Sequence, residues 1–235
     1  MPRALFGNGD GNGDGNGFGF VFGFAVTGAG GGSTSSPWPP APSPGYTPLP
    51  MSETKELWLV RHGETTASAG RRIAGWSDPP LTADGRRQAE AVRSRLDGTR
   101  FASVWSSDLD RAVSSARLGW GEPQLDRRLR EVHFGPLEGR GYDEVDGGLA
   151  EVFLVFRDFE IPGGESHQAL KRRVHGFVDE LPPGRHLLFV HGGVIRVLTQ
   201  DLGLDRFVST GSLVVVDWAG RRVLSLAERT RSPVG

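Results

Sequence analysis

The chain has 235 residues, a net charge of −1 and no cysteine. A near-neutral charge gives no support for nucleic acid or an anionic membrane as the main partner, because both select a basic face. Without cysteine there is neither a disulfide framework nor a thiol nucleophile, and the compartment is left undetermined on that ground. Only Lys55 and Lys171 are lysines among 27 basic residues. Arginine forks bind phosphate with two hydrogen bonds, although most of these arginines are expected on solvated helix faces.

Composition divides the chain near residue 54. The first fifty residues hold 13 of the 35 glycines and 8 of the 16 prolines, too little apolar surface to offset the entropy of ordering them. We expect a disordered tail and linker over 1–54, a single α/β catalytic domain over 55–230 and a flexible C-terminus over 231–235.

Three features of the tail admit other interpretations. Residues 10–15 fit the opening of a calcium loop, but the closing glutamate would fall on Val21, so a flexible tract is favoured. The apolar run 18–26 is too short to span a bilayer, and a signal peptide is poorly supported, so we expect a cytoplasmic protein. Globular sequence begins at Met51, which suggests translation from there, a hypothesis that intact mass tests.

From residue 55 onward, strands alternate with helices. An apolar strand over 57–61 precedes a proline-broken loop over 71–81. Thr82 is expected to cap a helix that turns Ala89, Val92 and Leu96 inward. A short strand over 102–105 follows, and Ser107 is expected to cap the next helix, which turns Leu109, Ala112, Val113 and Ala116 inward.

The second half repeats this alternation after an irregular stretch. Residues 125–160 suggest loops around a short helix, with Phe153, Phe156 and Phe159 as lid or cap residues. Helical spacing over 166–181 and a second apolar strand over 186–191 come next, followed by a helix over 194–202. Strands over 212–218 and 222–227 meet at a turn at Ala219-Gly220. We therefore predict an α/β sandwich of three layers with a mostly parallel central sheet.

Two strands of this sheet end in histidine, at His62 and His191. The carboxyl ends of parallel strands share one edge, where sheets of this type gather their ligands. Paired histidines serve either a metal or phosphate chemistry. A third metal ligand at close spacing is not evident, whereas Arg61 and Arg111 would repel a metal cation and attract a phosphoryl group.

Five motifs resemble those of the histidine phosphatase superfamily, also called the phosphoglycerate mutase-like superfamily. They occur in family order over about residues 57–200: LVRHGET at 59–65, SSDLDRA at 106–112, LREVHFG with LEG at 129–139, GGES at 163–166 and VHGG at 190–193. A lone RHG is weak evidence, whereas five ordered motifs are strong.

The resemblance implies a role for each matching residue. His62 would be the nucleophile that becomes a phosphohistidine, and Glu131 the proton donor. Arg61, Arg111 and His191 would bind the phosphoryl group, together with Thr65, Ser68 and Gly192. No metal or other cofactor is implied. Many members carry asparagine where this chain has Ser68, so phosphate affinity is reduced unless another donor such as Thr65 compensates.

Other polar residues of the motifs receive structural roles or none. Glu138 is expected to organise a loop, and Glu165 to lie in the first turn of a helix, where the dipole favours it. The remaining histidines are taken as ordinary surface or helix positions and receive no role: His133, His167, His175 and His186.

The leading function is hydrolysis of a small phosphomonoester. A bisphosphoglycerate-dependent phosphoglycerate mutase would use the same residues, although mutases carry a longer insertion between Glu131 and His191. A catalytically weak phospho-ligand-binding regulatory module is the third reading, kept open by Ser68. The expected partner is a small phosphorylated metabolite, a homodimer is open, and Tyr142, Phe153 and Phe156 suggest an apolar wall for the leaving group. Sugar phosphates, nucleotides and ribazole phosphate all remain candidate substrates.

Overall fold

The computed structural model describes residues 54–145 and 154–228, which belong to one compact unit. The expectations for the tail, the calcium-like tract, Met51 and residues 231–235 lie outside the described residues. Phe153 lies outside them as well. No helix in the described part of the chain is both long enough and apolar enough to cross a membrane.

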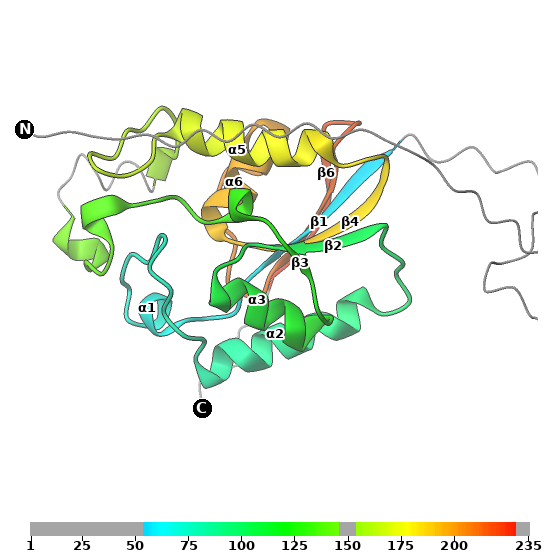
Figure 1. The fold of residues 1–235 in the computed structure, drawn as a ribbon, viewed down its shortest axis with the longest axis horizontal. Coiled ribbons are helices and arrows are strands. Elements are labelled where there is room, and N and C mark those ends of the chain that lie inside the picture. The colour runs from blue at the N-terminus through cyan, green and yellow to red at the C-terminus, as the bar shows by residue number, and fades with distance from the viewer. Residues whose placement is uncertain (1–53, 146–153, 229–235) are drawn as a thin grey trace, which may run out of the picture. The chain divides into compact units, whose positions relative to one another are not determined.

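A six-stranded sheet forms the centre of the unit (Figure 1). Its order is β3-β2-β4-β1-β5-β6, in which the first four strands are parallel and the last two are antiparallel to their neighbours. The strands are β1 (Lys55–Arg61), β2 (Ser103–Ser106), β3 (Gln124–Leu125), β4 (Gly184–Val190), β5 (Leu213–Asp217) and β6 (Arg222–Ala227). The predicted, mostly parallel sheet is confirmed, with the exposed two-residue β3 as an unpredicted edge.

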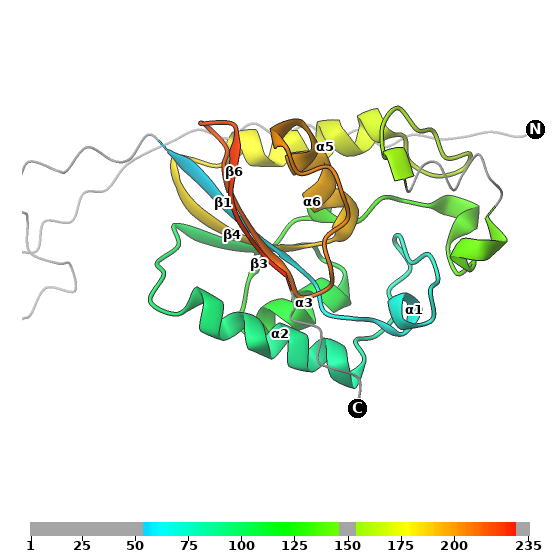
Figure 2. The ribbon, with the colours of Figure 1, turned by 180° about the vertical axis from the view of Figure 1, so that it is seen from behind.

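Helices cover both faces of this sheet, as Figures 1 and 2 show from opposite sides. On one face lie α2 (Ala83–Leu96) and α3 (Asp110–Gly119), and on the other α5 (His167–Glu180) and α6 (Gly192–Thr199). Shorter elements are α1 (Thr66–Ala69) and the 3-10 helices η1 (Arg127–Leu129), η2 (Gly135–Leu137), η3 (Tyr142–Glu144) and η4 (Gln200–Leu202). The three-layer α/β/α sandwich is confirmed.

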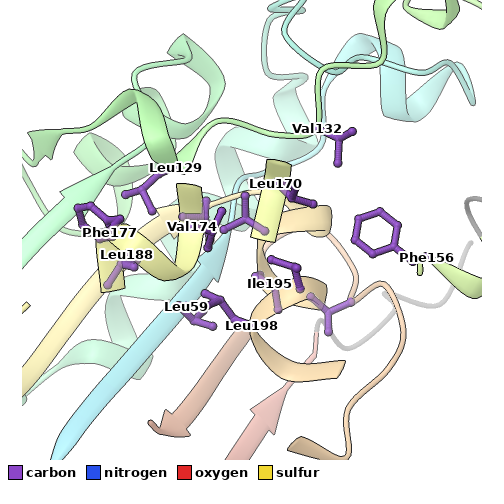
Figure 3. Close-up of a cluster of buried hydrophobic side chains, with 14 of the residues drawn as sticks. Leu59, Leu129, Val132, Phe156, Leu170, Val174, Phe177, Leu188, Ile195 and Leu198 are labelled. Atoms are coloured by element: carbon purple, nitrogen blue, oxygen red, sulfur yellow. The ribbon is translucent and has the colours of Figure 1, made fainter. Parts of the chain in front are cut away.

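Alternation along the strands divides the core into two clusters. Leu59 and Leu188 lie in the cluster on the α5 and α6 side (Figure 3), whereas Val60 and Phe189 lie in the cluster on the α2 and α3 side. Successive strand residues point to opposite faces, so each strand contributes to both apolar layers. Burial on both faces explains why these strands read as continuous apolar runs.

Two predicted helix starts are confirmed in detail. The Thr82 hydroxyl accepts a hydrogen bond from Gly85 N at 3.0 Å at the start of α2, and the Ser166 hydroxyl accepts one from Ala169 N at 3.2 Å at the start of α5. Such caps satisfy backbone donors that have no partner inside the helix. Both helices bury the residues that their spacing predicted.

The predicted cap at Ser107 is wrong. Helix α3 begins at Asp110, its N-cap is Leu109, and Ser107 Oγ accepts from Leu109 N instead. The first helical N–H groups find a partner far away in sequence, because the Asp78 carboxylate accepts from Asp110 N and Arg111 N. A capping group supplied by a distant loop leaves no local signal in the sequence.

The two described phenylalanines that were expected in a lid, Phe156 and Phe159, are core residues. Phe156 is fully buried and Phe159 nearly so, and their ring centroids lie 5.1 Å apart. The expected helix over 194–202 begins earlier, at Gly192, directly after His191, and ends as the 3-10 helix η4. The hairpin at Ala219-Gly220 is confirmed by the antiparallel pairing of β5 and β6.

Candidate active site

Parallel pairing of β1 and β4 brings the two strand-end histidines together. Arg61 is in register with Val190, and the ladder continues one residue further because His62 N donates to Val190 O at 3.0 Å. His191 follows directly after the end of β4, and the ring centroids of the two histidines lie 5.0 Å apart. The sheet edge therefore presents two imidazoles side by side, as the sequence predicted.

His62 has the protonation state of a nucleophile. Its Nδ1 lies 2.7 Å from Gly63 O, and since a carbonyl can only accept, Nδ1 carries the proton and Nε2 keeps its lone pair. Burial lowers the pKa of His62 well below 6.5, and the positive charges of Arg111 and Arg61 lower it further. The ring is therefore neutral at physiological pH.

His191 is buried beside it without a protein partner. Both ring nitrogens lack a hydrogen-bond partner among the described residues. Burial lowers the pKa of His191 well below its usual value, and the positive charges of Arg111, Arg173 and Arg61 lower it further. A buried polar atom without a protein partner is costly, and such atoms are expected where a side chain binds a ligand oxygen.

Two arginines carry positive charge to this end of the site. Arg61 Nη1 donates to Val208 O. Arg111 is buried, and it donates to Gly75 O at 2.6 Å and to Ser77 O at 2.8 Å. In each arginine Nε has no partner within residues 54–145 and 154–228. These hydrogen bonds hold both guanidinium groups in place, and the remaining N–H groups can donate to a phosphoryl oxygen.

Glu131 reaches the same site from an irregular segment between η1 and η2. Its carboxylate accepts from Gly193 N at 3.1 Å through either oxygen and from Val132 N at 3.0 Å. Gly193 lies in the first turn of α6, where N–H groups and the helix dipole favour a carboxylate. A Cβ at Gly193 would fall deep inside van der Waals contact of Glu131 Oε1 and 3.0 Å from Phe156 Cζ. Only glycine permits this approach.

The hydroxyls of Thr65 and Ser68 bind each other's backbone. Thr65 N donates to Ser68 Oγ at 2.9 Å and Ser68 N donates to Thr65 Oγ1 at 3.2 Å, a capping box at the start of α1. Both residues line the cavity described below. Gly192 is placed behind Arg61, since a Cβ there would lie 3.2 Å from Arg61 Cζ.

The site opens into a cavity of about 480 Å³. Its charged end is lined by Arg61, His62, Arg111 and Glu131. The remaining wall is mostly apolar, and it includes Ile73, Phe134, Tyr142, Leu154 and Phe207 together with Arg72. Tyr142 is therefore part of an apolar wall, as expected. Phe156 is not, because it is buried behind the wall.

A sequence profile of the Histidine phosphatase superfamily (branch 1) matches residues 57–230. The chain belongs to this superfamily.

Similar proteins within this superfamily carry mutase and phosphatase names. "Probable phosphoglycerate mutase GpmB" of Cronobacter sakazakii is 40% identical over 165 residues, which cover 65% of this chain and 77% of that protein. The crystal structure of phosphoglycerate mutase from Thermus thermophilus is 44% identical, with a TM-score of 0.70, over 75% of this chain and 100% of that one. A "putative alpha-ribazole-5'-P phosphatase" from Escherichia coli is 28% identical, with a TM-score of 0.61, over 77% and 98%.

Of the two glutamates in the motifs, one has the predicted role and the other does not. Glu138 organises a loop, as predicted, by accepting from Trp76 N, Ser77 N and Phe134 N. Glu165 does not lie in a first helical turn, because it precedes the N-cap Ser166, and its carboxylate pairs with Arg173. A charge partner eight residues further along the chain determines its position.

The other histidines include two buried ones. His167 Nε2 lies 2.9 Å from Gln200 Nε2, and His186 Nε2 lies 2.8 Å from Pro182 O. Both are buried away from the cavity lining, so the surface interpretation is wrong for His186 on β4. In residues 54–145 and 154–228, no group of three or more His, Cys, Asp or Glu side chains is arranged to hold a metal ion.

Several residues of the site were not predicted. Gly193 had a signal, since two glycines follow His191 at the expected sheet edge. Trp76 and Arg173, which contact the backbone of Glu131, had none that spacing reveals. Phe207 comes from a loop and Leu154 from a helical segment too short for periodicity to assign a direction to its side chain.

Proposed function

We propose that this histidine phosphatase hydrolyses a small phosphomonoester through a phosphohistidine on His62. The observation that carries the proposal is the neutral His62 imidazole beside His191, Arg61 and Arg111 at the charged end of a cavity that Glu131 also lines. This combination supplies a nucleophile, a binding site for an anion and a carboxyl group within one pocket.

In the first step, Nε2 of His62 attacks phosphorus, and the N–P bond forms as the bond to the leaving oxygen breaks. Arg61, Arg111 and His191 would donate to the equatorial oxygens, where negative charge is spread in the transition state. Glu131, protonated before this step, gives its proton to the leaving oxygen, so that an alcohol departs.

In the second step, water replaces the alcohol. Glu131, now a carboxylate, takes a proton from the water. The water oxygen attacks phosphorus as the N–P bond breaks. Inorganic phosphate leaves, and His62 is neutral again with Glu131 protonated. Every proton is accounted for by these two side chains, so the scheme needs no metal ion.

The cavity wall favours hydrolysis over mutase chemistry. A phosphoglycerate also carries a carboxylate, which would need a cation away from the phosphate-binding end. Among the described lining residues the one such cation is Arg72, whose Nη1 already donates to Gly139 O at 2.8 Å. The rest of this wall is largely apolar, and it suits the carbon skeleton of an uncharged alcohol.

Phosphoglycerate mutase activity is the second candidate. The relatives from Cronobacter sakazakii and Thermus thermophilus carry that name, and Arg72 has further donors that could meet a carboxylate. Adding 3-phosphoglycerate with catalytic bisphosphoglycerate separates the two activities. A mutase would produce 2-phosphoglycerate, whereas the proposed phosphatase releases inorganic phosphate.

The main test is a panel of phosphomonoesters without added metal, run on the protein and on His62→Ala. We expect phosphate release by the protein, unaffected by chelator, and a loss of at least about 10⁴-fold in the variant. Acid-labile, alkali-stable labelling from a ³²P-substrate should appear only with His62 present. Equal rates for the two proteins, or loss of activity with a chelator, would contradict the mechanism. Phosphate binding without release would favour the regulatory module.

A further inference from the structure

Glu131 lies on a part of the chain that no regular element holds. The segment from 131 to 134, between η1 and η2, is neither helix nor strand. His62, in contrast, follows directly on β1 and continues the sheet ladder. Leu129 and Val132 flank Glu131 in the chain, and both side chains belong to the buried cluster on the α5 and α6 side, in which Leu129 lies next to α5 (Figure 3). The backbone at Glu131 itself needs another support.

That support is Arg173 on α5, which is not a lining residue of the cavity. Its Nη1 donates to Arg128 O at 2.7 Å and to Arg130 O at 2.6 Å, and its Nη2 donates to Glu131 O at 2.8 Å. Nε and Nη2 also bind the Glu165 carboxylate, at 2.7 and 2.8 Å. All five N–H groups of this guanidinium therefore have acceptors, and three of them fix consecutive parts of one short segment.

A second donor meets the same carbonyl. Trp76 Nε1 donates to Glu131 O at 2.8 Å. The indole is held in turn by the Arg130 guanidinium, 5.1 Å above its ring, and by His133, whose ring centroid is 4.6 Å away. The carbonyl of Glu131 thus accepts from two side chains on one side, while its carboxylate accepts from Gly193 N on the other.

We propose that Arg173 is the positioning residue for the proton-donating Glu131. This proposal rests on the proposed function, and it gives a residue outside the cavity a role in positioning the proton donor. Without the Arg173 donors, the backbone at Glu131 would lose its main anchor, and the carboxyl group would shift relative to the leaving oxygen. A misplacement of about 1 Å costs about 10²-fold in rate. Phosphate binding, which uses Arg61 and Arg111, would be unaffected.

Leaving-group dependence distinguishes this role from a merely structural one. A p-nitrophenolate leaves readily as an anion, so its departure needs little help from an acid, whereas a benzyl alkoxide must be protonated as it leaves. The two phosphate esters are similar in size and both apolar. A displaced proton donor should therefore lower kcat/KM for benzyl phosphate far more than for p-nitrophenyl phosphate, while a general loss of folded enzyme lowers both equally.

The experiment compares kcat and KM of Arg173→Met, Glu131→Gln and the double variant on both esters. We expect Arg173→Met to lower kcat/KM, which reports the phosphorylation step, about 10²-fold on benzyl phosphate and less than about tenfold on p-nitrophenyl phosphate. Inhibition by inorganic phosphate should stay within about twofold. In the double variant, the loss should equal that of Glu131→Gln alone, because both changes remove the same function. Arg172→Met, an exposed neighbour on α5, is the matched control and should match the wild type.

Further variants guard against misfolding. Arg173→Met leaves the Glu165 carboxylate without its partner, so Arg173→Met/Glu165→Gln removes both charges together. Trp76→Phe deletes the second donor to Glu131 O while keeping an aromatic ring, and it should give a smaller change with the same leaving-group preference.

Equal losses of kcat/KM on the two esters, or losses of kcat/KM that multiply with those of Glu131→Gln, would overturn the proposal. If the wild-type protein hydrolyses neither ester, the proposed function fails, and the inference is then judged from a crystal structure of Arg173→Met. Displacement of the Glu131 carboxylate from Gly193 N would support it. A carboxylate that still accepts from Gly193 N would overturn it.

Discussion

The two ends of the cavity are built in different ways. At the charged end, His62 and His191 extend the paired strands β1 and β4, so backbone hydrogen bonds determine where they lie. The apolar wall comes from short helical segments that contribute Tyr142 and Leu154 and from a loop that contributes Phe207. Strand pairing positions His62 and His191, whereas the wall residues, like Glu131, are positioned by side-chain contacts. Substitutions that crowd the backbone near the charged end should therefore lower the rate. Substitutions of the arginines that hold the wall should change substrate preference.

The Arg196 side chain shows how the wall is held. This buried residue of α6 donates from Nη2 to Leu154 O at 2.7 Å, and its Cζ lies 5.0 Å from the centroid of the Phe207 ring. Its Nε pairs with Asp205 at 2.8 Å, a carboxylate that Arg157 also contacts at 3.3 Å. One guanidinium thus ties two lining residues to the helix that follows His191.

The largest effect is expected from Gly193→Ala. The added methyl group would overlap Glu131 Oε1, so either the glutamate or the start of α6 must move. A shift of this kind costs about 10²-fold in kcat/KM, measured by phosphate release. Gly176→Ala on α5 is the matched control, since nothing lies within 4 Å of its Cβ, and helix propensity should stabilise it slightly. Wild-type activity in Gly193→Ala would contradict the placement of Glu131 against α6.

A smaller, substrate-dependent effect is expected from Arg196→Met. Loss of the bond to Leu154 O and of the cation contact with Phe207 should loosen the wall. We expect KM to rise about tenfold for esters with bulky apolar leaving groups, about 1.4 kcal/mol, and to change little for methyl phosphate. Arg157→Met is the control, because Arg157 shares the partner Asp205 but is not among the described residues that line the cavity. An equal rise for every ester would indicate general destabilisation instead.

The same contrast explains what the sequence could and could not predict. Strand ends, caps such as Thr82 and the glycine after each strand-end histidine are local patterns, so the sheet, the layers and the charged end were all predictable. Asp78 caps α3 from another loop, and Arg173 reaches back to Glu131 from α5. Partners of this kind are set by the tertiary fold, and neither periodicity nor spacing encodes them.

A third prediction concerns the stability of the charged end. Burial lowers the folded-state pKa of His62 well below 6.5, so the unfolded chain binds more protons once the pH falls under about 6.5. The free energy of unfolding should therefore be highest above that pH and fall on acidification. Its difference between pH 7.5 and 5.5, measured by urea unfolding, should shrink by about 1 kcal/mol in His62→Gln. An unchanged difference would mean that His62 is protonated in the folded protein.

The smallest effect is expected from Ser68→Ala, which tests whether this residue belongs to the charged end at all. The Ser68 hydroxyl accepts from Thr65 N and donates to Thr65 O, so its hydrogen bonds already serve the start of α1. Its loss should cost about 0.5–1 kcal/mol of unfolding free energy, as for other caps, while KM for a phosphomonoester changes less than about threefold. A tenfold rise in KM at unchanged stability would show that the hydroxyl turns toward the phosphoryl group instead. Ser68 would then bind phosphate as the resemblance implies, and α1 would be part of the phosphate-binding site.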